Sequence, residues 1–333
     1  MTQGLSGVQC VDLSAESALL SEVRELLDRA QETDGVEAFS EGFRKQLGRA
    51  STHVHWALLI DGSPRALAAH APDGSAELVV DPSARGNGHG KEMAETVLNA
   101  RPDSGLWAHG DLPAARALAS RLSLTPTREL LVMALDGPAL QEVGGARSAA
   151  ESLDEGFIEL SYPDSVARWG RDAVERAWLD VNNDAFSWHP EQGGWTMDAL
   201  HDAMDTEWFD PDGVRLLWVD AHSGESDHER SVAGKSDSEL PALAGFHWTK
   251  RHSADLGEVY VVGLASDFRG RGLGDPLMRA GLEHLVAGGS RRVILYVEAD
   301  NGPAVRRYEQ MGFAVAERHV VYSRSGAGAG AEE

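Results

Sequence analysis

The stretch LVVDPSARGNGHGK at residues 78–91 and the stretch VGLASDFRGRGLGD at residues 262–275 decide the fold, because they repeat one pattern. Each begins with strand-forming residues, continues as Arg-x-x-Gly-x-Gly and leads into a predicted helix. Glycines at these spacings let the backbone approach a ligand closely, and the free amides of a helix N-terminus favour a phosphate group. Two copies at matched positions predict two domains, each with a pyrophosphate site.

Two other kinds of nucleotide-binding loop fit this pattern less well. A Rossmann loop needs an acidic residue about 20 positions further on, at the end of a second strand. Glu283 lies roughly that far from the second loop, but inside a predicted helix. A P-loop ends in Lys-Ser or Lys-Thr, and neither stretch does.

Composition restricts the class of protein. The chain has 333 residues, of which 42% are hydrophobic and 25% charged, which is normal for a soluble protein of two domains. Its formal net charge of -23 disfavours nucleic acid or an anionic membrane as a partner. No apolar run approaches the roughly 18 residues of a membrane span. We expect a soluble, cytoplasmic monomer.

The cysteine and histidine content predicts no metal. Cys10 is the only cysteine, which excludes a disulfide framework and a thiolate metal site. The 13 histidines show no His-Glu-x-x-His or other ligand spacing. For His189, which lies between Trp188 and Pro190, a structural role is favoured over a catalytic one.

Polar segments indicate the domain boundaries. We predict an N-terminal domain at residues 1–140, a linker at 141–155, a C-terminal domain at 156–324 and a disordered tail at 325–333. The polar stretch at 221–239 predicts a long surface loop or insertion between two strands.

Helices and strands alternate in the same order in both halves. In the first half, apolar residues at helical spacing predict a helix at 14–31 with Ser14 near its N-cap. In the second half, the pattern predicts a helix at 165–182 and a closing strand at 314–322. The predicted class is α+β, with two units that each have a mixed, mostly antiparallel sheet flanked by helices.

Both loops resemble the acyl-CoA loop of the GCN5-related N-acetyltransferase (GNAT) superfamily, Arg/Gln-x-x-Gly-x-Gly/Ala. LYVEADNGPAVRRYEQMGF at residues 295–313 resembles the later strand-helix motif of that superfamily, with its Asn, its Tyr and its closing Gly-Phe. The resemblance implies tandem GNAT folds and acetyl-CoA as co-substrate, with one candidate site in each half. The implied contacts in the first half are Leu78, Val79, Val80, Gly86, Asn87, Gly88, His89, Gly90 and Lys91. Those in the second half are Val262, Gly263, Leu264, Arg269, Gly270, Arg271, Gly272, Leu273, Gly274, Asp275, Asn301, Gly302, Pro303, Ala304, Val305 and Arg306.

Longer strings narrow the resemblance within the superfamily. They are VNNDAFSWHPEQGGWT at 181–196, WFDPDG at 208–213, GFHWTK at 245–250 and GEVYVVGL at 257–264. They resemble the members that acetylate the cysteinyl amine of 1D-myo-inositol 2-(L-cysteinylamino)-2-deoxy-α-D-glucopyranoside, a small pseudo-disaccharide. This resemblance implies that the substrate is bound by Glu41, Glu191, Lys250, Glu258 and Tyr296.

The residue types also suit amine acetylation. An amine must be neutral to attack a thioester, so the site needs a proton acceptor, donors for the carbonyl oxygen and an acid near the leaving sulfur. Glu258 begins the strand that leads to the second loop, and we assign it amine binding and proton acceptance, through water. Tyr308 is the predicted general acid, since its phenol has a basicity comparable to that of a thiolate. The amides of Val262, Gly263 and Leu264 are placed to polarise the carbonyl. The structural alternatives are that Glu258 is a solvated residue at the end of a strand and that Tyr308 is a packing residue of an amphipathic helix.

The two halves differ at the reacting positions. When Leu78 is placed opposite Val262, Gly74 falls opposite Glu258, and a matched alignment of the later helices places Leu118 opposite Tyr308. We expect the first half to bind acetyl-CoA without transferring the acetyl group. Two alternatives stay open: an N-acetyltransferase for an aminoglycoside, a polyamine or a protein N-terminus, and a non-enzymatic tandem acetyl-CoA sensor.

Overall fold

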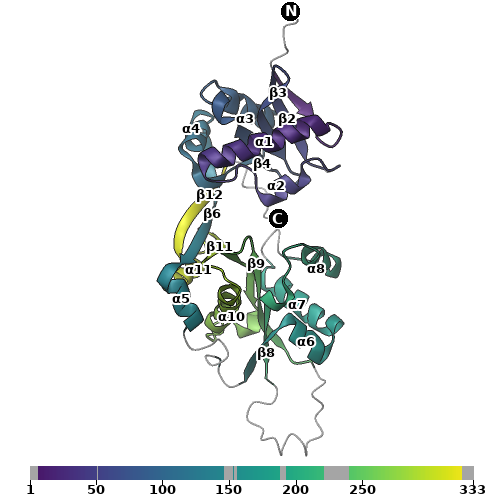
Figure 1. Cartoon of the computed structure of the whole chain (residues 1–333), viewed down its shortest axis with the longest axis vertical. Coiled ribbons are helices and arrows are strands. Elements are labelled where there is room, and N and C mark those ends of the chain that lie inside the picture. The colour runs from purple at the N-terminus through teal and green to yellow at the C-terminus, as the bar shows by residue number, and fades with distance from the viewer. Residues whose placement is uncertain are drawn as a thin grey trace, which may run out of the picture. The chain divides into compact units, whose positions relative to one another are not determined.

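The computed structural model describes residues 7–50, 52–145, 153, 156–187, 193–220 and 240–324. The chain divides into two compact units. The first comprises residues 1–132, 297–302 and 316–333, and the second comprises residues 133–296 and 303–315. Each unit is a mixed sheet flanked by helices, so the predicted α+β class is confirmed (Figure 1). The predicted insertion at 221–239 and the tail lie outside the described residues.

The first unit is built around β1 to β5. Its strand order is β1-β2-β3-β4-β5-β12, in which neighbouring strands are antiparallel except β4 and β5, which run parallel. Helix α1 packs against one face of the sheet, and α3 packs against the other. The elements are β1 (Gly7–Val11), α1 (Ser17–Asp34), α2 (Glu41–Gln46), β2 (Val54–Ile60), β3 (Ser63–His70), β4 (Ser75–Val80), α3 (His89–Ala100), β5 (Gly105–Ala108) and α4 (Pro113–Arg121).

The second unit has the strand order β11-β10-β9-β8-β7, in which only β10 and β11 pair in parallel. Helices α6, α7 and α8 cover one face, and α10 covers the other. The elements are α5 (Gly137–Gly145), β7 (Phe157–Ser161), α6 (Tyr162–Trp169), α7 (Arg171–Ala185), α8 (Met197–Met204), β8 (Val214–Val219), β9 (Leu243–Arg251), β10 (Leu256–Leu264), α10 (Gly274–Ala287), β11 (Arg292–Glu298) and α11 (Gly302–Gln310).

Two predicted helix boundaries are wrong. Ser14 does not cap α1, because its amide and its hydroxyl both bond to Asp12 Oδ1, at 3.0 and 2.6 Å, in a local turn that delays the helix. The single helix predicted at 165–182 is two helices. Gly170, at φ 83°, ends α6 and starts α7, and Ser161 caps α6 by accepting a hydrogen bond from the Asp164 amide at 3.2 Å.

The predicted linker at 141–155 begins inside a helix. Helix α5 (Gly137–Gly145) follows directly on β6 (Leu124–Asp136) and packs against α10 within the second unit. Leu140 is fully buried, whereas Gln141 and Glu142 are exposed, so the polar residues at the start of the predicted linker lie on the outer side of this helix.

The last strand, β12 (Ala314–Arg324), joins the sheet of the first unit. Val320, Val321 and Tyr322 pair antiparallel with Ala108, Trp107 and Leu106 of β5. The structure thus differs from the prediction of two contiguous domains, in which residues 314–322 close the second sheet. Alternating apolar residues indicate a strand, but the sheet that it joins depends on which edge is free.

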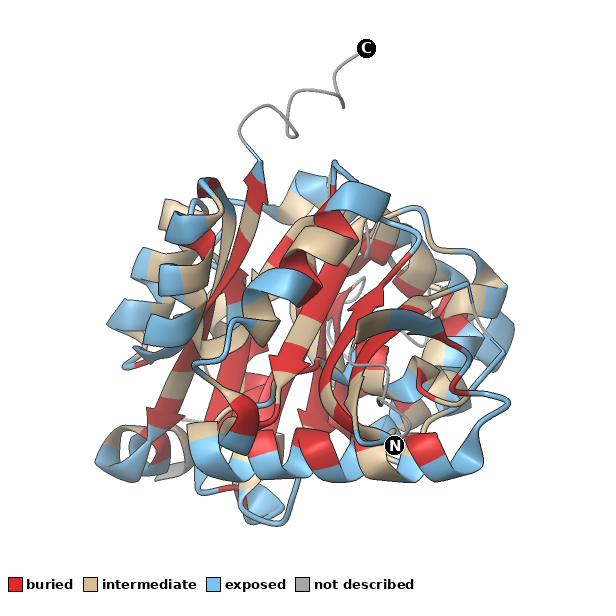
Figure 2. Cartoon of the chain, turned by 90° about the horizontal axis from the view of Figure 1, so that it is seen from above, coloured by how far each residue is buried: buried red, intermediate tan, exposed pale blue. Residues whose placement is uncertain are grey.

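Buried residues gather on the strands, while the helices present exposed outer faces (Figure 2). This is the burial expected of a sheet covered by amphipathic helices. Among the helices of the described ranges, none combines the length and the apolar character needed to cross a bilayer.

The pairing of β12 with the sheet of the first unit can be tested at Val321. This residue is 8% exposed and pairs with Trp107 of β5. Val321→Asp should destabilise the first unit by at least about 3 kcal/mol, because a charge would be buried without a partner. Hydrogen exchange at the amides of Leu106 and Trp107 should accelerate. Val315→Asp, a matched change at a position of β12 that is 37% exposed, should leave this exchange nearly unchanged. If the amides of Leu106 and Trp107 were equally protected in both variants, the pairing of β12 with β5 would be contradicted.

Candidate functional site

The two Gly-rich loops have the same backbone shape. Gly86 and Gly88 have φ values of 81° and 89°, and Gly270 and Gly272 have values of 74° and 80°. This left-handed region favours glycine. A Cβ atom at any of the four would meet nothing within 4 Å, so each loop has an open side on which a ligand can approach. Helices α3 and α10 begin directly after the loops, with the free amides that suit a pyrophosphate.

The leading arginine of each loop braces the loop from within. Arg85 Nε donates to the main-chain oxygen of Val80 at 3.1 Å, and Arg269 Nε donates to that of Leu264 at 3.2 Å. Arg85 is further held by Asp34, whose two carboxylate oxygens lie 2.6 and 2.8 Å from its guanidinium nitrogens. The sequence motif therefore carries a structural arginine, and direct contact between Arg269 and a pyrophosphate stays a prediction.

In both units, the strand before the loop separates from its parallel neighbour. Pairing between β4 and β5 ends with Glu77 and Trp107, and pairing between β10 and β11 ends with Val259 and Leu295. A β-bulge at Tyr260 adds one residue to β10 against β9. The predicted contact residues 78–80 and 262–264 thus lie on the segments where the strand is no longer paired with its parallel neighbour.

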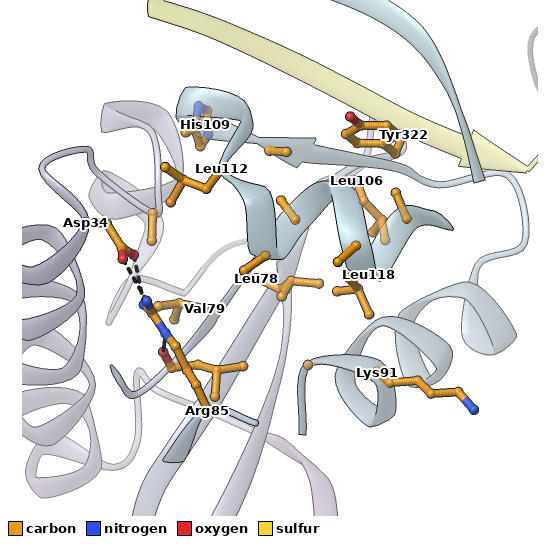
Figure 3. A pocket seen from close by; sticks show the side chains of 18 of the residues that line it. Asp34, Leu78, Val79, Arg85, Lys91, Leu106, His109, Leu112, Leu118 and Tyr322 are labelled. Atoms are coloured by element: carbon orange, nitrogen blue, oxygen red, sulfur yellow. Dashed lines mark hydrogen bonds and ion pairs between the residues drawn. The ribbon is translucent and has the colours of Figure 1, made fainter. Parts of the chain in front are cut away.

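The loop of the first unit opens on a cavity of about 360 Å³ (Figure 3). Leu78, Leu106, Leu118 and Tyr322 line it, together with glycines of the loop. This size and apolar lining are those of a small-molecule site. Lys91 extends away from the apolar side chains, and its ammonium lies 3.5 Å from the Glu95 carboxylate.

The first unit also contains a buried carboxylate that sequence reasoning missed. Glu77 Oε2 accepts a hydrogen bond from the Ser40 amide at 2.8 Å, and Oε1 lies 2.9 Å from His109 Nε2. His109 Nδ1 lies 3.0 Å from Nδ1 of His319 on β12. Since both oxygens of Glu77 and both ring nitrogens of His109 have these partners, the cluster fits a structural role. The feature of the sequence that could have indicated this cluster was a Glu at an inward-facing position of a strand.

In the second unit, Glu258 faces Lys250 across the sheet. The two residues are directly opposite in the register of β9 and β10, and they are 5% and 7% exposed. The Lys250 ammonium lies 4.9 Å from the ring centre of Trp208 and 5.7 Å from that of Tyr260. A buried carboxylate and a buried ammonium between aromatic rings form a polar centre suited to a polar substrate. Sequence reasoning named Glu258 and Lys250 but missed Trp208 and Tyr260.

Glu258 has a further partner that the sequence did not reveal. His252 Nε2 lies 2.5 Å from Glu258 Oε2. The two residues are six positions apart, and only the turn between β9 and β10 brings them together. A His two residues after a strand Lys was the signal available, since such residues share one face of a strand.

Tyr308 lies on α11, with its ring centre 6.0 Å from that of Phe313. Burial raises the pKa of the Tyr308 phenol above its usual value of 10.0. A phenol that keeps its proton at neutral pH can donate it to a departing thiolate. The predicted role as general acid is compatible with this environment and stays a prediction.

The remaining predicted residues stay predictions. Glu41 begins α2 in the first unit, where its carboxylate lies 2.8 Å from the Lys45 ammonium. Tyr296 is an exposed residue of β11. Glu191 and His189 lie outside the described residues.

The later motif forms the turn into α11. The Asn301 amide donates to the Glu298 main-chain oxygen at 3.0 Å, within the first unit. In the second unit, Asp275 at the start of α10 pairs with Arg307 of α11, with Nε 2.6 Å from Oδ1. Over the ranges that the structure describes, no group of three or more His, Cys, Asp or Glu side chains is placed to hold a metal ion.

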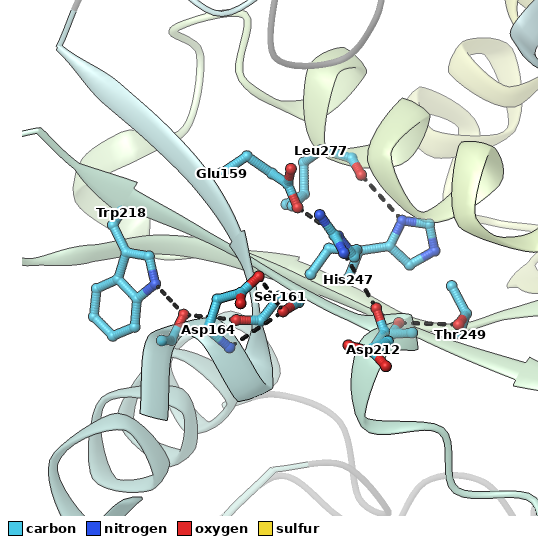
Figure 4. Close-up of polar contacts among 11 residues, drawn as sticks. Glu159, Ser161, Asp164, Asp212, Trp218, His247, Thr249 and Leu277 are labelled. Carbon is cyan, nitrogen blue, oxygen red and sulfur yellow. Dashed lines mark hydrogen bonds and ion pairs between the residues drawn. The ribbon is translucent and has the colours of Figure 1, made fainter. Parts of the chain in front are cut away.

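Buried polar contacts hold β8 and β9 between the helices of the second unit (Figure 4). His247 Nδ1 donates to the main-chain oxygen of Leu277 at 3.1 Å, on the α10 side of the sheet. Thr249 donates to the main-chain oxygen of Gly213 at 2.9 Å, and Trp218 Nε1 donates to Ser165 Oγ at 3.0 Å. These bonds fix the strand that carries Lys250.

Comparison with known proteins identifies the class. A family model described as "Acetyltransferase (GNAT) family" matches residues 197–313. A GCN5-related N-acetyltransferase from Sphaerobacter thermophilus aligns with a TM-score of 0.63 at 20% identity, covering 95% of this chain and 94% of that one. A tandem GNAT protein from the clavulanic acid biosynthesis pathway aligns with a TM-score of 0.64 at 15% identity, covering 95% and 97%. The chain has two tandem GNAT folds, as predicted, and is an N-acetyltransferase; GNAT enzymes use acetyl-CoA.

A relative identifies the family within this class. The mycothiol acetyltransferase of Corynebacterium efficiens is 47% identical over 301 residues, covering 90% of each chain. The chain belongs to the mycothiol acetyltransferase family.

The buried histidines predict how stability depends on pH. Burial lowers the pKa of His247 to about 4, and burial together with His109 lowers the pKa of His319 to about 4. Both rings therefore stay neutral in the folded protein, whereas in the unfolded chain they gain a proton near pH 6.5. Stability is complete above that pH and falls as the pH decreases toward 4. Between about pH 7 and pH 5, each histidine should remove about 2 kcal/mol of unfolding free energy.

Urea unfolding at these two pH values measures the effect. His247→Asn keeps a donor near Leu277 and removes the titrating ring. Its destabilisation relative to the wild type should shrink as the pH falls. A constant difference across this range would show that His247 titrates alike in both states.

Proposed function

We propose that this chain transfers the acetyl group of acetyl-CoA to the cysteinyl amine of 1D-myo-inositol 2-(L-cysteinylamino)-2-deoxy-α-D-glucopyranoside, giving mycothiol and CoA. The similarity of the chain to the mycothiol acetyltransferase of Corynebacterium efficiens supports this substrate. The observation that carries the proposal is the buried Glu258 opposite the buried Lys250, next to the point where β10 separates from β11.

The second unit supplies the groups that this reaction needs. Bound acetyl-CoA supplies the acetyl thioester. Glu258 takes the proton of the substrate ammonium, so that the neutral amine can attack. Residues 262–264 lie beyond the last pair with β11 but stay paired with β9, so those of their amides that point away from β9 polarise the carbonyl. Tyr308 keeps its phenolic proton because burial raises its pKa, and it donates this proton to the leaving sulfur.

Substrate recognition in this proposal combines charge and aromatic contact. Lys250, held by Trp208 and Tyr260, donates to hydroxyl groups of the pseudo-disaccharide, and Tyr296 adds an exposed phenol. Glu41 and Glu191 complete the predicted set. The proposal places the enzyme in the cytoplasm as a monomer, and the reducing environment suits its exposed Cys10.

The first unit, we propose, binds a second acetyl-CoA without transferring its acetyl group. The cavity of about 360 Å³ and the open side of Gly86 and Gly88 fit the cofactor. Leu118, which lines this cavity, cannot act as an acid. Glu77 is held by Ser40 and His109 and is not free to accept a proton from a substrate.

The function is tested by incubating the protein with acetyl-CoA and the cysteinyl pseudo-disaccharide. CoA thiol should appear together with a product heavier by one acetyl group. The pseudo-disaccharide without its cysteinyl group is the matched control and should release little CoA. If an aminoglycoside or a polyamine were acetylated in preference to the pseudo-disaccharide, that amine would be the substrate. If acetyl-CoA bound without transfer to any amine, an acetyl-CoA sensor would be favoured.

Tyr308→Phe should lower kcat about 100-fold or more, because it removes the proton donor while the packing against Phe313 remains. Tyr162→Phe removes a buried hydroxyl that bonds to Glu175 at 2.5 Å in the same unit, and should affect mainly stability. Steady-state kinetics and thermal unfolding of both variants separate the two effects. A Tyr308→Phe enzyme with unchanged kcat would remove Tyr308 from the mechanism.

The two cofactor sites can be separated by one matched pair of substitutions. Gly88→Ala and Gly272→Ala each place a methyl group on the open side of a loop, at a positive φ. Each should weaken acetyl-CoA at its own site about tenfold or more. Calorimetric titration should change from two bound acetyl-CoA per chain to one at moderate concentrations. Only Gly272→Ala should lower turnover; equal loss of turnover in both would contradict the division of roles.

A further inference from the structure

The turn between β9 and β10 holds His252 in a fixed place. The His252 amide donates to the main-chain oxygen of Leu256 at 3.0 Å. Ser253 Oγ accepts hydrogen bonds from the amides of Asp255 and Leu256, at 3.3 and 3.1 Å. The main-chain oxygen of Asp255 in turn accepts from the Arg291 amide at 2.8 Å, which ties the turn to the start of β11. The position of the His252 backbone is therefore set by main-chain bonds on both sides.

Strand alternation directs His252 toward Glu258. Residues two apart on a strand share a face, so Lys250 and His252 point to the same side of the sheet. Glu258 is directly opposite Lys250 and joins them on that side. Arg251, between them, points to the other side, where its guanidinium donates to the main-chain oxygen of Gly288 at 2.6 Å.

When Glu258 is ionised, the direction of the hydrogen bond between the His252 and Glu258 side chains is determined. A carboxylate only accepts hydrogen bonds, so His252 Nε2 carries a proton and donates it to Oε2, 2.5 Å away. Within the described ranges His252 contacts Oε2 of this carboxylate, and the proposal assigns Oε1 to the substrate amine. The His252 side chain is 31% exposed, whereas that of Glu258 is 7% exposed. The ring thus lies between the buried carboxylate and solvent.

We propose that His252 is a positioning residue for the transfer reaction. It holds the Glu258 carboxylate in one orientation through the hydrogen bond that it donates to Oε2. The inference rests on the proposed function of Glu258. The charged groups around the turn are Lys250 and Glu258 on the shared face, and Asp255 and Arg291 at its outer end, 3.2 Å apart.

Two substitutions separate orientation from packing. His252→Ala removes the donor and should lower kcat for the cysteinyl substrate about tenfold to a hundredfold, with little change in the KM for acetyl-CoA. His252→Gln places an amide donor near the position of Nε2 and should restore most of the kcat.

A matched control is His284→Ala. His284 Nε2 lies 2.8 Å from Asp210 Oδ2, so this change also removes a His–carboxylate pair from the second unit, but not one that involves Glu258. Its kcat should stay within about twofold of the wild type. The inference is overturned if His252→Ala keeps the kcat of the wild type. It is also overturned if His252→Gln loses as much activity as His252→Ala.

A measurement without substrate keeps this test separate from the test of the function. In nitrogen NMR spectra of the full chain, the His252 ring should be the tautomer with its proton on Nε2, with the signal assigned by its loss in His252→Gln. Glu258→Gln should change this signal. A neutral His252 ring with its proton on Nδ1 and none on Nε2 would overturn the inference whether or not the wild type acetylates the pseudo-disaccharide. An inactive wild type with the expected tautomer would overturn the function alone, leaving His252 as the residue that orients Glu258.

Discussion

The sheet hydrogen bonds between β10 and β11 stop after Val259, and the site of the second unit depends on this separation. Up to that point, the parallel ladder and the antiparallel ladder with β9 hold Glu258 opposite Lys250. Beyond it, β10 has a bulge at Tyr260 and stays paired with β9 as far as Leu264, so backbone groups are released only on the side that faced β11. A rigid carboxylate and unpaired strand amides therefore occur within a few residues of each other. The first unit repeats this break after Glu77.

The same backbone frame is used differently in the two units. In the first, the carboxylate nearest the break is Glu77, whose oxygens are taken by a main-chain amide and a histidine. In the second, Glu258 has one oxygen next to His252 and lies on the same face as a buried ammonium. Duplication of a fold preserves the phosphate loop because it is made by the backbone, while the reacting side chains are free to diverge. This difference supports the proposal of one reaction centre and two cofactor sites.

Much of the fold and part of the site could be predicted from local pattern. The loops were recognised because only glycine adopts the positive φ values at Gly86, Gly88, Gly270 and Gly272 without strain. Other features could not be predicted. The local turn at Ser14 and the break at Gly170 depend on which hydrogen bonds compete with the helix. The pairing of β12 with the first unit depends on the free edge of β5, which is far away in the sequence.

The amino-acid sequence by itself determined the two tandem folds, the place of both loops and the identity of Glu258 and Lys250 as a candidate pair. These follow from short-range spacing, which the chain carries wherever it folds. Only the tertiary structure decided that Arg85 and Arg269 brace their loops, that Trp208 and Tyr260 enclose Lys250, and that His252 meets Glu258. The physical reason is that register, bulges and turns choose the neighbours of each side chain. Those neighbours set its charge, its hydrogen bonds and its chemistry.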